Sequence, residues 1–151
     1  MWEDLSLIDA YQAVAKEIGC QSQIEFSEEC FGSPSSIMYR LVDGLAEDDL
    51  TSIEMCIRFY EECPMYVGSG RHRERIARKL KHVTLTDNQQ ARLREVFKSF
   101  INKRFIKAEM KDFVKLVKCY SNEDLENFCR KRVNIANPYV KKYCEYILNS
   151  D

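Results

Sequence analysis

Glycine, proline and long apolar runs are scarce in this chain. Its 151 residues include five glycines and three prolines, which excludes collagen-like and low-complexity sequence. No stretch approaches the roughly 18 uninterrupted apolar residues that a membrane helix needs, and the first residues lack the positive leader and apolar segment of a signal peptide. Because 45% of the residues are hydrophobic and 31% are charged, disorder is excluded as well. We expect a folded, soluble protein of the cytoplasm.

Close pairs of cysteines are also missing. The seven cysteines are an odd number in a chain long enough to fold by packing alone, which predicts free thiols in a reducing compartment. The nearest two, Cys56 and Cys63, are seven residues apart, and His72 and His82 are the only imidazoles. Zinc sites normally contain closer pairs such as Cys-x-x-Cys. We therefore expect no metal and no cofactor.

No catalytic constellation is recognisable either. A nucleophile pair of Cys63 with a histidine would lack the third, orienting group. Adjacent acids such as Asp48 and Asp49 diverge by about 100° on a helix and do not share a site. The segment Gly68-Ser69-Gly70 precedes a helix, where anions are favoured, but it lacks the Gly-Lys-Ser/Thr ending of a nucleotide-binding loop. We predict that the protein is not an enzyme.

Helical periodicity, by contrast, runs through most of the chain. Apolar residues recur at spacings of three and four, which predicts an all-α fold of about eight helices. Three later helix starts carry local signals: a capping box at Thr86 and Gln89, a cap at Ser121, and Asn137 followed by Pro138. The helices are predicted near residues 5–18, 37–45, 48–63, 71–83, 87–101, 106–117, 122–133 and 138–147.

The spacing of the last five helices suggests two architectures. Helix pairs repeat about every 32 to 35 residues, which is the size of an α-solenoid unit. The hallmark residues of tetratricopeptide and ankyrin repeats are missing, so an antiparallel helical bundle and a short solenoid-like stack of helix pairs both fit. We expect a single all-α domain over 1–151. A candidate sub-structure boundary lies at 63–70, where Pro64, Gly68 and Gly70 interrupt the helical pattern.

Charge is segregated along the chain. Residues 1–66 carry three basic and fourteen acidic side chains, and residues 67–151 carry twenty basic and ten acidic ones. Either the two halves cancel each other's field within the molecule, or each half faces a different partner. The acidic half could meet a basic protein or imitate the charge of nucleic acid.

Two basic stripes stand out in the C-terminal half. On a helical wheel, Arg71, Arg75, Arg78 and His82 share one stripe with Lys79 beside it, and arginine suits phosphate geometry. A solvated face and an intramolecular contact with the acidic half are the alternatives. The second stripe lies within about 80° of the wheel and consists of Lys107, Lys111, Lys115 and Lys118. It could follow a phosphate backbone, with Tyr120, Tyr139 or Tyr143 stacking on bases.

These patterns lead to one functional hypothesis and one alternative. We predict an intracellular, non-enzymatic binding or adaptor protein that engages a macromolecular partner, most simply another protein, through the two basic stripes. The alternative is direct nucleic-acid binding through the same stripes, which the acidic half would oppose by repulsion. No membrane partner is expected, and the sequence leaves the oligomeric state open.

Overall fold

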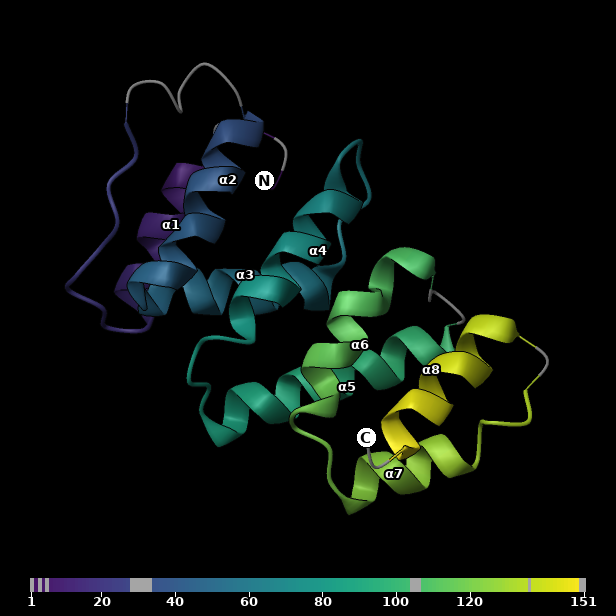
Figure 1. Cartoon of the computed structure of the whole chain (residues 1–151). Helices are drawn as coiled ribbons and strands as arrows, with labels where there is room; N and C mark the ends of the chain where they lie inside the picture. The colour runs from purple at the N-terminus through teal and green to yellow at the C-terminus, as the bar shows by residue number, and fades with distance from the viewer. Residues whose placement is uncertain are drawn as a thin grey trace. The chain divides into compact units, whose positions relative to one another are not determined.

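The computed structural model describes residues 2, 4, 6–27, 34–103, 107–135 and 137–149, with the side chains of 34 and 108 excepted. Over these residues the chain is all-helical and contains no strand, which confirms the predicted fold class. The α-helices, shown in Figure 1, are α1 (Ser6–Glu17), α2 (Pro34–Asp43), α3 (Leu50–Glu62), α4 (Ser69–Leu80), α5 (Asp87–Asn102), α6 (Lys111–Lys118), α7 (Glu123–Arg130) and α8 (Pro138–Leu148). Two short 3-10 helices, η2 (Gly44–Glu47) and η3 (Ala108–Met110), precede α3 and α6.

The helices form two compact units, Met1–Thr84 and Leu85–Asp151. This division falls after α4, beyond the segment 63–70 that the sequence suggested as a sub-structure boundary. The first unit therefore contains α4 and the first basic stripe, which we call the arginine stripe, together with the acidic residues of 1–66. The second unit contains the second basic stripe, which we call the lysine stripe. The single-domain assignment stays a prediction.

The N-terminal unit is built around α3. Helix α1 packs on α3, and α2 packs on α4. The two pairs also contact each other, because α1 touches α2 and α3 touches α4. Four side chains of α3, Cys56, Ile57, Phe59 and Tyr60, are fully buried. Asp49 is the N-cap of α3, and its carboxylate accepts a hydrogen bond from the Ser52 amide, so a preferred capping residue satisfies one of the free amides at the start of the helix.

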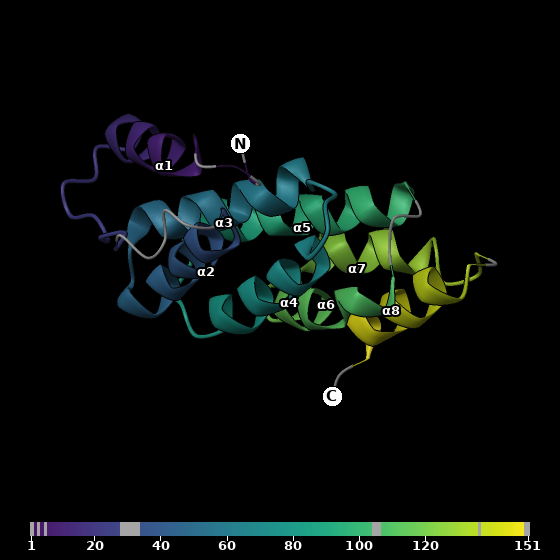
Figure 2. The same cartoon turned by 90° about the horizontal axis from the view of Figure 1, so that it is seen from above.

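The C-terminal unit is a closed set of four helices. Helix α5 contacts α6, α6 contacts α8, α8 contacts α7, and α7 returns to α5 (Figure 2). Phe100 of α5 meets Phe113 of α6 with ring centroids 5.5 Å apart. On α8 the predicted apolar stripe is buried, including Val140 and Ile147. Burial of one apolar face from each helix provides the core.

The local start signals decide the helix boundaries in two of three cases. Thr86 and Gln89 form the predicted capping box, and the Asn137 side chain caps the amides of α8 with Pro138 in the first turn. The cap predicted at Ser121 is wrong, because the Asn122 side chain accepts from the Leu125 amide.

Two further helix bounds differ from the pattern. Helix α7 ends at Arg130, so Val133 is not part of it, although its position continues the apolar spacing. The predicted helix start near 106 lies outside the described residues. Within the described part, α6 begins at Lys111 after the turn of η3.

Candidate functional site

The arginine stripe of α4 is largely engaged within the N-terminal unit. Arg75 donates to the Asp43 carboxylate at 3.0 Å, and Lys79 lies 3.4 Å from the same carboxylate. Arg75 also lies over the Tyr39 ring, 4.3 Å from its centroid. Arg78 pairs with Glu74 one turn earlier on α4, at 3.2 Å. The structure therefore brings the centre of this stripe onto acidic residues of its own unit.

The ends of the arginine stripe remain exposed. Arg71 and His82 are both solvent-exposed, and neither forms an ion pair with a described residue. Arg71 lies in the first turn of α4, whereas His82 follows the end of the helix at Leu80. With Arg75, Arg78 and Lys79 paired between them, the two exposed groups do not form a continuous cationic surface.

Helix α4 also carries a buried histidine and a buried arginine. His72 is 3% exposed and contacts the ring of Tyr39, whose centroid is 5.1 Å away. Burial, reinforced by the charge of Arg75, lowers the pKa of His72 to about 4. Arg73 donates to the Pro64 carbonyl at 3.0 Å and to the Ser69 hydroxyl at 3.3 Å. Arg73 thereby holds the loop between α3 and α4 in place, and the His72 ring lies 6.2 Å from the ring of Tyr66 in the same loop.

Two members of the lysine stripe take part in contacts within the C-terminal unit, Lys107 through its backbone and Lys118 through its side chain. Lys107 precedes α6, and its carbonyl accepts a hydrogen bond from the Tyr143 hydroxyl at 3.1 Å. Lys118 reaches the C-terminal end of α8, where its ammonium donates to the carbonyls of Tyr146 at 2.8 Å and Asn149 at 2.6 Å. Since those carbonyls lack partners inside the helix, the ammonium satisfies them and complements the negative end of the helix dipole.

Lys111 and Lys115 are the available members of this stripe. They stand one turn apart on α6, where Lys111 is exposed and Lys115 is half-buried. Neither side chain pairs with a carboxylate in the described ranges. The sequence pattern did not identify a third lysine beside them, Lys142 of α8, because it lies on another helix.

A groove of about 200 Å³ lies between α6 and α8, beside these lysines. The residues that line the groove are spaced at helical intervals along α6 and α8, so one face of each helix forms a wall. Glu145 and Asn149 complete the rim on the α8 side. The main lining is Lys111, Val114 and Lys115 from α6, and Lys142, Tyr143 and Tyr146 from α8. We call Lys111, Lys115 and Lys142 the lysine face.

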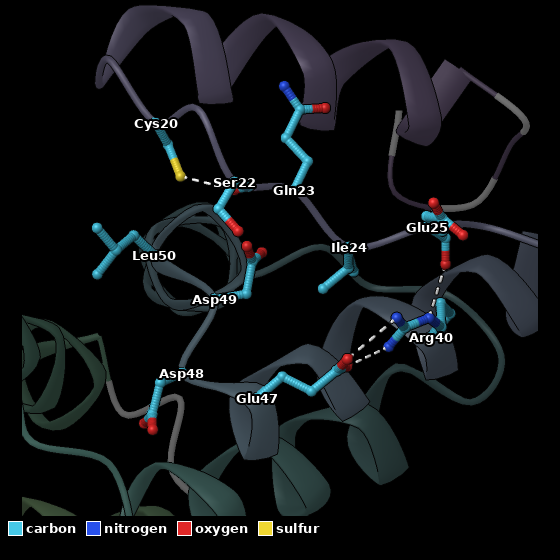
Figure 3. Close-up of a pocket in the computed structure, with 10 residues that line it drawn as sticks. All are labelled: Cys20, Ser22, Gln23, Ile24, Glu25, Arg40, Glu47, Asp48, Asp49 and Leu50. Atoms are coloured by element: carbon cyan, nitrogen blue, oxygen red, sulfur yellow. Dashed lines mark hydrogen bonds and ion pairs between the residues drawn. The ribbon is translucent and has the colours of Figure 1, made fainter.

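The N-terminal unit contains a larger cleft, of about 620 Å³, between the 20–25 segment and the start of α3. Figure 3 shows Arg40 and Glu47 pointing toward each other and Cys20 next to Ser22, whereas Gln23 and Asp48 point away. Arg40 donates to Glu47 at 2.6 Å and to the Glu25 carbonyl at 2.8 Å, and the Cys20 thiol donates to the Ser22 carbonyl at 2.8 Å. This arrangement ties the 20–25 segment to the unit.

Asp49 forms a buried hydrogen-bond centre at the back of the same cleft. Its Oδ2 accepts from the Tyr11 hydroxyl at 2.7 Å, from the Ser52 amide at 2.9 Å and from the Ser52 hydroxyl at 2.8 Å. The Tyr11 oxygen in turn accepts from the Ile24 amide at 3.0 Å. Burial and the hydrogen bond to Asp49 raise the pKa of Tyr11, so this hydroxyl stays protonated and acts as a donor. The network is structural.

The described cysteines do not form a metal centre. All six described cysteines are free thiols, as the sequence predicted; Cys56, Cys129 and Cys144 are buried, and Cys119 is exposed. In the part of the chain that the structure describes, no three histidine, cysteine or acidic side chains come together as ligands for a metal ion. Within the same ranges, no helix combines the length and apolar character required to cross a lipid bilayer.

Comparisons with family models, with curated proteins and with solved structures found no match to this chain. The function must therefore be inferred from the geometry of its own surfaces.

Proposed function

We propose that this chain is a non-enzymatic, cytoplasmic binding protein that holds an acidic protein partner on the lysine face of its C-terminal unit. The observation that carries the proposal is the contrast between the two basic stripes. Arg75 and Lys79 are paired with Asp43, whereas Lys111, Lys115 and Lys142 surround an open groove without a described carboxylate partner.

Electrostatics supports a partner of opposite charge. Three ammonium groups on one face repel one another, and Glu145 is the carboxylate of the groove's lining. A carboxylate from a partner relieves this repulsion, and complementary fields speed the encounter of two proteins. Exposed pairs contribute roughly 0.2–1 kcal/mol each, so the lysines provide specificity and orientation, and apolar contact in the groove must provide the remaining affinity.

Affinity capture from the native host tests this proposal. The wild-type chain is compared with the double variant Lys111→Glu and Lys115→Glu, and with Lys141→Glu as the control. Lys141 is also an exposed lysine of α8 but does not line the groove. We expect the double variant to lose the captured protein by tenfold or more while the control retains it. Equal capture by all three chains, each verified as folded by circular dichroism, would disprove the proposal.

Nucleic-acid binding is the second candidate, and the ridge of Lys111 and Lys115 along α6 favours it. It predicts affinity for an oligonucleotide that falls steeply between about 50 and 200 mM salt, because each neutralised phosphate releases counterions. Titration of the wild-type chain and of the double variant with single- and double-stranded DNA and RNA distinguishes the candidates. Lysine-dependent, salt-sensitive binding would favour nucleic acid over an acidic protein.

A further inference from the structure

The size of the α6–α8 groove restricts what it can hold. Pockets for drug-sized ligands and cofactors occupy about 300–1,000 Å³, and this groove measures about 200 Å³. Its floor is formed by the apolar surfaces of Val114 and Tyr143, which are 1% and 3% exposed. A single apolar side chain matches this space better than a metabolite does.

The rim of the groove determines the charge of the occupant. Lys111 and Lys115 stand along the α6 wall and Lys142 stands on the α8 wall, against the single carboxylate of Glu145. At the far end of α8, Lys118 is held by the carbonyls of Tyr146 and Asn149. It therefore fixes the two helices to each other and leaves the three remaining lysines to meet an acidic chain.

The tyrosines of the groove are not available for stacking on bases. The Tyr143 hydroxyl donates to the Lys107 carbonyl, and the Tyr143 ring stacks with that of Tyr139 at a centroid distance of 6.3 Å. The ammonium of Lys118 covers the Tyr146 ring, 4.4 Å from its centroid. Binding of single-stranded nucleic acid combines cationic grooves with free aromatic faces, so these contacts favour a protein occupant.

We infer that the α6–α8 groove binds a short acidic protein segment, inserting one apolar side chain between Val114 and Tyr146 while flanking carboxylates contact Lys111, Lys115 and Lys142. This inference rests on the proposed function and adds to it the chemical class of the segment. A buried apolar anchor surrounded by weaker polar contacts is the usual distribution of binding energy in protein interfaces.

Peptide display on the full chain tests this inference without knowledge of the natural partner. A library of random twelve-residue peptides is selected on the wild-type chain, with prior depletion on the Lys111→Glu and Lys115→Glu double variant. We expect the enriched sequences to contain one large apolar residue flanked by aspartate or glutamate. In fluorescence anisotropy at about 150 mM salt, replacing that residue by serine should weaken binding by about tenfold or more.

The control variants separate the groove from general electrostatics. Lys141→Glu should retain the selected peptide, and Lys142→Glu should lose about tenfold in affinity. Val114→Met, which fills the groove from its floor without changing charge, should weaken the peptide equally. Circular dichroism verifies that each variant is folded.

Several outcomes would overturn the inference. These are failure to enrich any peptide, enrichment of sequences without acidic residues, and binding that survives removal of the apolar anchor. Lysine-dependent binding of a (dT)20 oligonucleotide stronger than that of the peptide would replace the protein segment by nucleic acid. Lysine-dependent dimers in sedimentation would replace it by a second copy of the chain. If display fails while host capture still depends on Lys111 and Lys115, the proposed function stands and only the groove inference is wrong.

Discussion

Replacement of Asp49 by alanine should destabilise the N-terminal unit strongly. The substitution removes the N-cap of α3, which costs about 1 kcal/mol. It also removes the acceptor that lies 2.7 Å from the Tyr11 hydroxyl. Because Tyr11 is 0% exposed, no water replaces this acceptor, and an unsatisfied buried polar group costs about 1–3 kcal/mol. Together these contributions give a loss of about 2–4 kcal/mol in the free energy of unfolding.

The single tryptophan of the chain provides the assay. Trp2 is 6% exposed and packs edge-on against Phe59 of α3, with ring centroids 5.1 Å apart. Its fluorescence therefore reports unfolding of the N-terminal unit in urea, where the midpoint concentration multiplied by the slope gives the free energy of unfolding.

Asp49→Asn is the matched control. All three hydrogen bonds converge on the single oxygen Oδ2 of Asp49, and an asparagine side-chain oxygen can occupy the same position and remains a preferred cap. We expect Asp49→Asn to cost less than about 1 kcal/mol, chiefly through the lost interaction with the helix dipole. If Asp49→Ala matches the wild type within about 0.5 kcal/mol, or if both variants lose the same amount, the hydrogen-bond argument is refuted.

Three further predictions concern burial and charge. His72 is neutral in the folded chain with a pKa of about 4, below its unfolded value of about 6.5. Its contribution to stability is therefore complete above pH 6.5 and is lost as the pH falls towards 4, by up to about 3 kcal/mol; Trp2 fluorescence in urea should follow this loss, and His72→Phe should remove it. Lys118→Met should lower the stability of the C-terminal unit by about 1–2 kcal/mol, measured by circular dichroism, whereas Lys115→Met should leave it within about 0.5 kcal/mol; equal losses would contradict the division of the stripe. Cys119 should react with maleimide in the folded chain while Cys56, which is 0% exposed, reacts only after unfolding, and mass spectrometry of the labelled peptides checks both.

Local signals predicted the fold because they act within one turn of a helix. The capping box at Thr86 and the Asn137-Pro138 start are confirmed, since the capping side chains bond to backbone groups three residues away or fewer. At residues 121 and 122 the sequence offered two good caps in succession, and the apolar pattern alone did not choose between them. In the structure Asn122 is the cap, because the Leu125 amide donates a hydrogen bond to its side-chain oxygen.

The candidate site was only partly predictable, because its contacts are distant in sequence. A helical wheel placed Arg75 on a cationic stripe, but its partner Asp43 lies 32 residues earlier. Similarly, the carbonyls that hold Lys118 lie 28 and 31 residues later. Periodicity therefore found both stripes and could not show which lysines and arginines were already in use.

The groove itself arises from the packing of α6 against α8. Lys142 and Tyr146 stand one turn apart on α8, beside its buried stripe, and this spacing was the available signal in the sequence. To identify the groove from this spacing, one would have to know that α6, rather than α5 or α7, packs beside Lys142 and Tyr146 on α8. Helix pairing depends on the complete set of apolar faces, which a single periodic pattern does not specify.

Site-specific photocrosslinking in the native host tests the lysine face most directly. A photoreactive benzoylphenylalanine replaces Lys115 in one chain and the control residue Lys141 in another. The account predicts a covalent adduct to a macromolecular partner from position 115 that disappears when Lys111 and Lys142 are both changed to glutamate, with a weaker adduct or none from position 141. Adducts from position 141 alone, or adducts from position 115 that persist in the charge-reversed chain, would contradict it.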